Sequence, residues 1–291
     1  MTPFSVKAGA ITLRSVVALS SLIGSAGTAA DYQPVRCTLR QPYAGRPLHA
    51  AVVVPTPTAL PETALDSATV ARLEAALAKI RSKTQAPAIT AAVGVTGKGM
   101  WTNGDTVPLF WASAGKTFTA VSVLQLAQEG KLSLDDLVSR WIKNVPNGDV
   151  ATVRDLLAHT AGLFSANEDL KAHADPRYRG PVETLAIARR HGAMFCPGGN
   201  WRYSNTGYDL LGEIVRNVDG RPIDQAITAR IIAPLGLSTL RALPPGGGAD
   251  GVAPLVSTNE KPIDPSWAGA AGPIVGSASD MIRFWNAIQT V

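Results

Sequence analysis

Phe110-Trp111-Ala112-Ser113-Ala114-Gly115-Lys116 is the stretch that leads into the most apolar segment of the chain. From Phe118 to Ala127, apolar residues recur nearly all round a helix, and Gly130 follows. A helix that is apolar on every side belongs in a core, and a glycine just past the last turn is a common helix end. We therefore predict a buried central helix over residues 113–129, with Ser113 held rigidly at its start.

Ser113 and Lys116 are three residues apart, so a helix would place the hydroxyl and the amine on one face. A serine hydroxyl is a poor nucleophile until a base takes its proton. The lysine amine can be that base only if burial or positive charge lowers its pKa from about 10.4, and a buried helix start favours this. Taken alone, the pair is a weak signal, and such a pair is more often an N-capping serine with a surface lysine. A phosphate-binding loop is excluded, because Phe110 stands where that motif needs glycine.

A polar, aromatic, glycine-rich loop lies about ninety residues further on, from Pro197 to Tyr208. It contains Tyr203, which can relay a proton as phenol, or as phenolate if cationic neighbours lower its pKa. It also contains Asn205, whose side chain offers both a donor and an acceptor to an amide. In isolation, the default interpretation of Tyr203 is a half-buried anchor.

Five elements occur in one order along the chain. They are Phe110-Trp111-Ala112-Ser113-Ala114-Gly115-Lys116, Leu156-Leu157-Ala158-His159-Thr160-Ala161-Gly162-Leu163, the loop from Pro197 to Tyr208, Pro234-Leu235-Gly236-Leu237, and Gly276-Ser277-Ala278-Ser279-Asp280-Met281. Together they resemble the serine β-lactamase and penicillin-binding-protein family, in its branch of class C β-lactamases, D-alanyl-D-alanine carboxypeptidases and related esterases. The resemblance covers residues 66–291, and no Ser-Asp-Asn triplet points to the class A branch.

The resemblance implies acyl transfer. Ser113 would attack a carbonyl carbon and supply half of an oxyanion hole through its backbone N–H, Lys116 and Tyr203 would move protons, and Asn205 would contact the substrate amide. His159 corresponds to a structural element of the family rather than to a base. We expect no cofactor and no metal, because the other histidines lack ligand-like spacing; these are His49, His173 and His191.

The chain departs from the family in one respect. A third element, Lys-Thr-Gly or a His-x-Gly equivalent, is missing after the Tyr203 loop. It would sit on a strand that also supplies the second oxyanion donor, whose loss typically costs about 100- to 1,000-fold in rate. Because the sequence ends at Val291, we expect a truncated member with an incomplete sheet and weak or no activity.

Three functions therefore stay open. The first is a secreted serine hydrolase acting on β-lactams, D-alanyl peptides or small esters. The second is an impaired or inactive member of the family that binds peptidoglycan peptides without turnover. The third is a fragment with no stable function, which would show no cooperative unfolding.

The rest of the pattern predicts an α/β fold of the β-lactamase/transpeptidase type, with an antiparallel or mixed sheet. A helix over 67–83 precedes a hairpin of 88–95 and 100–102, which holds the only clear strands, and we expect the helices 67–83 and 113–129 to flank the sheet. A largely helical region follows, from about 131 to 270. Its helices, with a last one near the end, are predicted at 134–143, 152–159, 182–191, 207–218, 223–233 and 278–289.

The N-terminal residues look like an export signal. Residues 1–30 join a cationic start, a short apolar run and a small-residue exit, as secretory signal peptides do, and the run is shorter than the roughly 20 residues of a membrane span. Residues 31–65 carry six prolines and suit an extended linker before the domain at 66–291. We expect a secreted or periplasmic protein, in which Cys37 and Cys196 could pair.

The composition and charge of the chain indicate which kinds of partner it can have. The 291 residues are 46% hydrophobic and 17% charged, which is typical of a compact globular protein. The formal charge of +5 includes Lys7 and Arg14 of the signal segment, so the mature chain is only weakly basic. We therefore expect a small-molecule or peptide substrate, no nucleic acid, no stable membrane insertion and a monomer.

Overall fold

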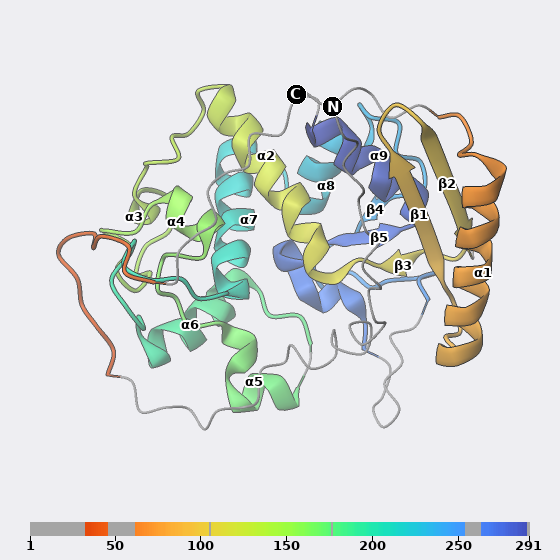
Figure 1. The fold of residues 1–291 in the computed structure, drawn as a ribbon. Helices are drawn as coiled ribbons and strands as arrows, with labels where there is room; N and C mark the ends of the chain where they lie inside the picture. The colour runs from red at the N-terminus through yellow and green to blue at the C-terminus, as the bar shows by residue number, and fades with distance from the viewer. Residues whose placement is uncertain (1–32, 46–61, 105, 176, 254–262, 290–291) are drawn as a thin grey trace, which may run out of the picture. The chain divides into compact units, whose positions relative to one another are not determined.

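The computed structural model describes residues 33–45, 62–104, 106–175, 177–253 and 263–289. From Pro34 onward they belong to one compact unit, in which a mostly helical region lies beside a hairpin and its covering helices (Figure 1). The predicted signal peptide and much of the proline-rich extension lie outside the described residues.

The predicted helix and hairpin are confirmed. α1 (Ser67–Thr84) starts after Asp66, whose side chain accepts a hydrogen bond from the backbone N–H of Thr69. β1 (Thr90–Val95) then pairs antiparallel with β2 (Gly99–Gly104) through a tight turn. The fold begins with a helix and a ribbon, as the periodicity indicates.

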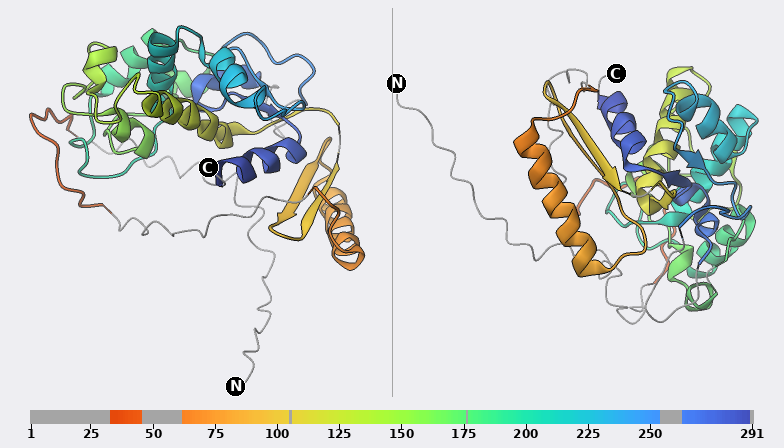
Figure 2. Two further views of the ribbon diagram at one scale, coloured as in Figure 1. Left: turned by 90° about the horizontal axis from the view of Figure 1, so that it is seen from above. Right: turned by 90° about the vertical axis from the view of Figure 1, so that its right-hand side faces the viewer.

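A helix covers each face of this ribbon. α1 packs on one face, where Leu77 lies against Trp101 in a small apolar cluster. α9 (Ala278–Gln289) packs against β1 on the other side, and both views in Figure 2 place the hairpin between α1 and α9. The prediction that the helix of residues 113–129 covers this ribbon is therefore wrong. α9 lies far from β1 along the chain, so this contact depends on the tertiary fold and no local pattern in the sequence shows it.

A second, three-stranded sheet corrects the prediction that the hairpin holds the only strands. Its order is β3 (Leu109–Phe110), β5 (Ile274–Gly276) and β4 (Arg241–Ala242), and both pairings are antiparallel. Strands of two or three residues show no period in a sequence. β3 depends on a partner strand more than 160 residues further along the chain, and β4 on one more than 30 residues further.

The main core surrounds α2 (Lys116–Gln128) and α7 (Asn205–Asp219), which lie side by side in Figure 1. The prediction of a buried helix after Ser113 is confirmed, although Ser113 itself lies on the short 3-10 turn η1 (Ala112–Gly115). The ring of Phe118 is fully buried and stacks on Phe284, with 3.7 Å between ring centroids. The start of α2 is thereby fixed from within the core.

The remaining helices follow the predictions with changes in length. The predicted helix of residues 134–143 shrinks to four residues, because Leu137 and Ile142 on either side are extended, and the predicted helix of 223–233 ends in a π-helical turn. Three short helices with too few turns for a periodic signal were not predicted, namely η2, α5 and η4. The bounds are α3 (Val138–Trp141), α4 (Val153–Ala158), η2 (Ala166–Glu168), α5 (Leu170–Ala174), α6 (Pro181–His191), α8 (Ile223–Ile227), η3 (Thr228–Ile232) and η4 (Pro265–Ala271).

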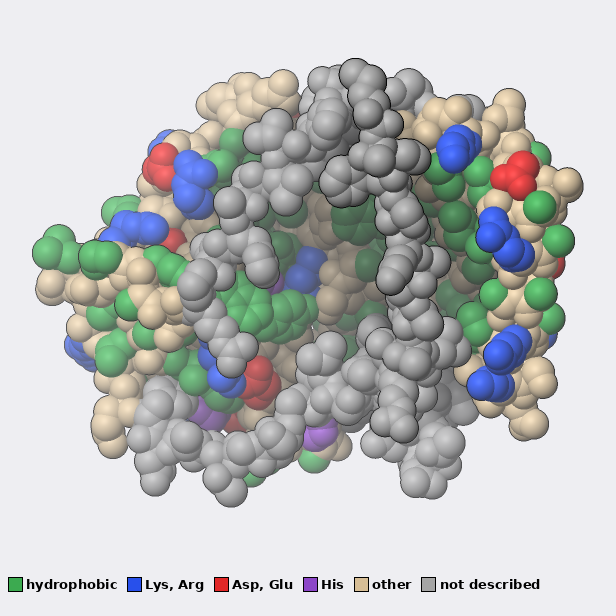
Figure 3. Space-filling view, viewed as in Figure 1, with side chains coloured by type: hydrophobic (Ala, Val, Ile, Leu, Met, Phe, Trp, Pro, Cys, Tyr) green, Lys and Arg blue, Asp and Glu red, His purple; other side chains and the backbone are tan. Residues whose placement is uncertain are grey.

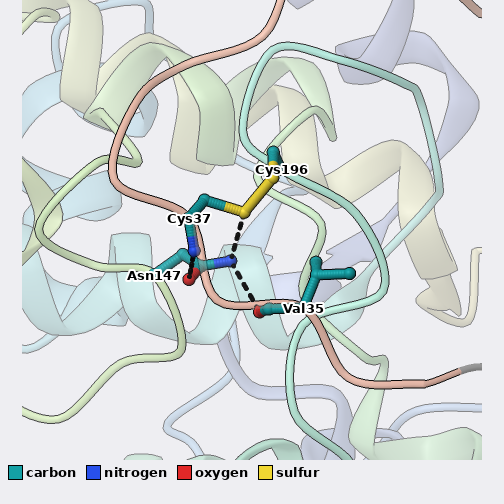
Figure 4. Close-up of a disulfide and its surroundings, with 4 residues drawn as sticks. All are labelled: Val35, Cys37, Asn147 and Cys196. Atoms are coloured by element: carbon teal, nitrogen blue, oxygen red, sulfur yellow. Dashed lines mark hydrogen bonds between the residues drawn. A yellow bond between two sulfur atoms is a disulfide. The ribbon is translucent and has the colours of Figure 1, made fainter.

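The described part of the N-terminal extension is not a free linker. Residues 34–45, here called the N-terminal strap, run along residues 193–199 through backbone hydrogen bonds. A disulfide joins Cys37 to Cys196, and Asn147 bonds to the strap beside it (Figure 4). The pairing that the sequence left open is thus present, because the strap brings the two cysteines together.

No helix in the described ranges is both long enough and apolar enough to cross a bilayer.

Candidate active site

Hydrogen bonds from Trp111 to strand β5 fix the position of Ser113. Trp111 donates its backbone N–H to the carbonyl of Ile274 at 3.0 Å and its indole N–H to the carbonyl of Gly276 at 3.1 Å. The next residue, Ala112, has φ of +46°, a backbone conformation that is costly for any residue with a side chain. Strain of this kind persists only where the surroundings enforce it, and here it presents the exposed Ser113 at the start of η1.

Close backbone packing holds the start of α2 in place. A Cβ on Gly115 would come 3.0 Å from Cδ of Pro273, so only glycine fits there without a shift. Lys116 follows and is 6% exposed. The Ser-x-x-Lys spacing therefore joins an exposed hydroxyl to a buried amine one turn away.

The Lys116 amine has three hydrogen-bond acceptors around it. Nζ lies 3.1 Å from Oγ of Ser113, 2.7 Å from Oδ1 of Asn205 and 2.6 Å from the carbonyl oxygen of Ala271. An ammonium has three donors, so all of them are used. The amine also lies 4.8 Å from the centre of the Tyr203 ring.

Burial lowers the pKa of Lys116 to about 7, while the charge of Asp209 acts in the opposite direction. The uncharged amine is therefore accessible near neutral pH, which is the condition that the sequence set for Lys116 as a base.

Tyr203 reaches the same hydroxyl from the distant loop. Its Oη donates to Oγ of Ser113 at 2.6 Å. Burial raises the pKa of Tyr203, and the hydrogen bond with Ser113 only partly offsets this. This direction favours the neutral phenol over the phenolate that the sequence left as an alternative.

His159 packs against Tyr203. It ends α4 in a left-handed conformation, and its Nδ1 accepts the backbone N–H of Ser204 at 3.2 Å. The rings of His159 and Tyr203 lie 4.6 Å apart. Burial and the nearby Lys116 lower the pKa of His159 to about 4. The imidazole is therefore uncharged near neutral pH, and it orders the loop that carries Tyr203.

Asn205 links the amine to a polar network that the sequence did not reveal. Its Nδ2 donates to Oδ1 of Asn167 at 2.8 Å, and its backbone N–H donates to Oγ of Ser165. Ser165 in turn donates to Asn167. The side-chain oxygen and the side-chain nitrogen of Asn205 each keep capacity for one more hydrogen bond. Ser165 and Asn167 stand in no motif, so only their place in the fold identifies them.

A cavity of about 100 Å³ opens from Ser113 into the protein. Figure 3 shows a hollow, lined by hydrophobic side chains, on the face seen in Figure 1. The cavity lining is Phe110, Ala112, Ser113, Ala166, Asn167, Ala172, Arg177, Arg179, Thr184, Asn205, Asp209, Trp267, Ala268 and Ala271. The four residues predicted for the site therefore meet at one place: Ser113 and Asn205 in the cavity wall, and Lys116 and Tyr203 on the Ser113 hydroxyl.

Metal ligands do not gather in the described part of the chain, where no three His, Cys, Asp or Glu side chains are grouped to hold an ion.

The family model described as Beta-lactamase matches residues 70–290. A putative penicillin-binding protein, PbpX of Bacillus subtilis, is 29% identical over 198 residues, which are 64% of this chain and 47% of that protein. The chain spans about half or less of the length of the curated relatives it matches.

Solved structures show the same fold. A D-stereospecific amidohydrolase from Streptomyces sp. superposes with a TM-score of 0.61 at 32% identity, covering 69% of this chain and 67% of that one. An octameric penicillin-binding protein homologue from Pyrococcus abyssi gives 0.59 at 25% identity, covering 75% and 55%. The predicted β-lactamase/transpeptidase-like fold is confirmed.

Proposed function

This chain belongs to the Beta-lactamase family, and on that premise we propose that it is a serine hydrolase that forms an acyl-enzyme through Ser113. One observation carries the proposal: Oγ of Ser113 lies 3.1 Å from the Lys116 amine and 2.6 Å from the Tyr203 hydroxyl. The Lys116 amine and the Tyr203 hydroxyl come from two distant segments, and both contact this one oxygen. Both can therefore take part in moving the proton of the Ser113 hydroxyl.

In the first step, the uncharged amine of Lys116 takes the proton of the Ser113 hydroxyl as Oγ bonds to the substrate carbonyl carbon. The carbonyl oxygen becomes an oxyanion, which we expect the backbone N–H of Ser113 to stabilise. Asn205 can hold the substrate amide through its remaining donor and acceptor capacity.

In the second step, the bond between the carbonyl carbon and the leaving group breaks. The neutral phenol of Tyr203 gives its proton to the leaving nitrogen or oxygen and regains one from Lys116. Water then attacks the acyl-enzyme and passes a proton back through the same groups. Ser113 leaves as a hydroxyl, which restores the enzyme.

The substrate classes that fit this chemistry are β-lactams, D-alanyl peptides and small esters or amides. The Streptomyces amidohydrolase supports the amide class by its name alone. All of these share a carbonyl that the Ser113 oxygen can attack.

Labelling with a fluorescent penicillin tests the acyl-enzyme. We expect a labelled band, with the label on the peptide that contains Ser113 by mass spectrometry. Ser113→Ala should abolish it, whereas Ser122→Ala, at a buried hydroxyl that donates to the carbonyl of Phe118 in the same helix, should not. A panel of D-alanyl peptides and small esters then measures turnover. Binding that survives Ser113→Ala, with no label and no turnover in the wild type, would favour the non-catalytic alternative.

We also propose that the protein is exported. The signal-like residues 1–30 and the Cys37–Cys196 disulfide support this, because disulfides persist in oxidising compartments. Fractionation of cells expressing the full sequence should find the processed chain outside the cytoplasm. A chain that keeps residues 1–30 and stays in the cytoplasm would refute the proposal.

For the oligomeric state we propose a monomer, although the Pyrococcus abyssi homologue is octameric. Light scattering coupled to gel filtration should give a mass close to that of one chain, and a multiple of it would show assembly.

A further inference from the structure

The acidic side chain of Asp209 lies in the active-site cavity without a hydrogen-bond partner among the described residues. Asp209 is half-buried, belongs to α7 and lines the same cavity as Ser113. The Lys116 amine does not bond to it, because its three donors are used by Ser113, Asn205 and Ala271. A carboxyl group that lines a cavity and has no hydrogen-bond partner in the described part of the chain is open to a ligand that carries donors.

The other charges around the cavity are balanced. Arg177 bonds to Asp175 and Glu183, and Arg179 pairs with the same two acids. Two guanidinium groups thus face two carboxylates. Asp209 is therefore the cavity-lining charge with no ion pair in the described structure, so a positive group from a ligand would meet no competing partner there.

The surroundings of the carboxyl suit a cation. Trp267 lines the cavity with Asp209, and aromatic faces attract ammonium groups. The backbone lies close by at Gly269, where a Cβ would stand 3.5 Å from Oδ1 of Asp209. Burial raises the pKa of Asp209 to about 8, and a cation paired with the carboxyl would stabilise its ionised form.

The position along α7 indicates which half of the substrate would carry the charge. Asp209 is four residues after Asn205, so both side chains lie on one helix face, one turn apart. The leaving group must depart to solvent, whereas the acyl half stays bonded to Ser113 inside the cavity. A cavity of about 100 Å³ has room for a small acyl group only.

We propose that Asp209 is a specificity-determining residue that binds a primary ammonium group on the acyl half of the substrate. The inference rests on the proposed function and narrows it to substrates such as unblocked amino-acid amides and esters.

Matched substrates test this. Hydrolysis of D-alanine p-nitroanilide, N-acetyl-D-alanine p-nitroanilide and N-acetyl-D-lysine p-nitroanilide is measured in the wild type and in Asp209→Asn. We expect the wild type to prefer a substrate with a free ammonium by about 10- to 100-fold in kcat/KM, the range of a charge-assisted hydrogen bond. The first and third substrates distinguish an α-ammonium from a side-chain one. Asp209→Asn should erase the preference, and circular dichroism shows that the variant folds.

Glu213→Gln is the matched control. Glu213 lies one turn further along α7, pairs with Arg216 and is not part of the cavity lining, so its loss should leave the preference intact. An equal loss on all substrates in Asp209→Asn, or a wild-type preference for N-acetyl-D-alanine p-nitroanilide, would overturn the proposal.

A binding measurement separates this inference from the proposed function. Calorimetry with Ser113→Ala compares D-alaninamide and N-acetyl-D-alaninamide, with and without Asp209→Asn. Ammonium-selective binding that depends on Asp209, together with no turnover in the wild type, would uphold the inference and refute the hydrolase. Turnover in the wild type without such selectivity would support the hydrolase and refute the inference.

Discussion

Lys116 decides the chemistry at the scale of single residues. Its amine is buried, bonded to three oxygens and balanced between burial, which lowers its pKa, and Asp209, which raises it. A free lysine side chain is protonated at neutral pH. Here the fold supplies the uncharged base.

The first prediction concerns pH. Because the pKa of Lys116 is lowered from 10.5 to about 7, the uncharged amine is the minor form below pH 7 and the major form above it. We expect kcat/KM to rise about tenfold per pH unit below pH 7 and to level off above it. Steady-state rates between pH 5 and 9 measure this. A flat profile across that range would contradict Lys116 as the base.

The second prediction concerns Tyr203. Tyr203→Phe removes the hydroxyl that donates to Ser113 and keeps the ring, so we expect kcat/KM to fall about 10²- to 10⁴-fold. Tyr208→Phe is the control, because that hydroxyl donates to the carbonyl of Leu157 and not to Ser113. Steady-state kinetics and circular dichroism compare the two. Equal losses in both variants would show that packing, not proton transfer, explains the effect.

At the scale of elements, the N-terminal strap supports the loop that carries Tyr203. Gln41 and Ala44 donate backbone hydrogen bonds to Pro197 and Gly199. Arg40 bonds through both terminal nitrogens to Asp155, which is 1% exposed. The strap thereby ties the start of α4 to the turn that precedes Tyr203.

The third prediction concerns this ion pair. Arg40→Ala leaves the carboxylate of Asp155 buried with fewer partners, although Thr152 and Thr160 still bond to it. We expect a loss of about 1–3 kcal/mol in the free energy of unfolding. Urea denaturation measures it. Arg36→Ala, at an exposed position of the same strap, should change little, and equal effects of the two substitutions would show that the Asp155 pair is not the cause.

At the scale of the whole molecule, the disulfide closes the chain over 159 residues. The disulfide joins the strap to the segment beside the active site. Its formation lowers the conformational entropy of the unfolded chain.

The fourth prediction follows from that closure. Reduction should lower the free energy of unfolding by about 2–5 kcal/mol. Calorimetric melting with and without reductant measures it, and thiol titration confirms that reduction is complete. The double variant Cys37→Ser with Cys196→Ser should match the reduced protein. An unchanged melting temperature after complete reduction would mean that the strap is held by its other contacts.

Much of the fold was predictable where local signals repeat. α1, the hairpin, α6, α7 and α9 show turns, caps or apolar periods, and their bounds differ from prediction by a few residues at most. β3, β4 and β5 were missed because each is two or three residues long and exists through pairing with distant segments. Asn167 and Asp209 were missed for a similar reason. Asn167 belongs to the site only through its hydrogen bond with Asn205, and Asp209 only because it lines the cavity.

The sequence by itself determined that Ser113 and Lys116 lie one helical turn apart and that Tyr203 and Asn205 lie close together where a loop leads into a helix, because those relations are local. Only the tertiary structure decided that the loop meets the turn, that the strap bonds to the loop, and that the Lys116 amine is buried. A pKa depends on all the atoms around a group. Those atoms come from segments that the chain brings together only when it folds.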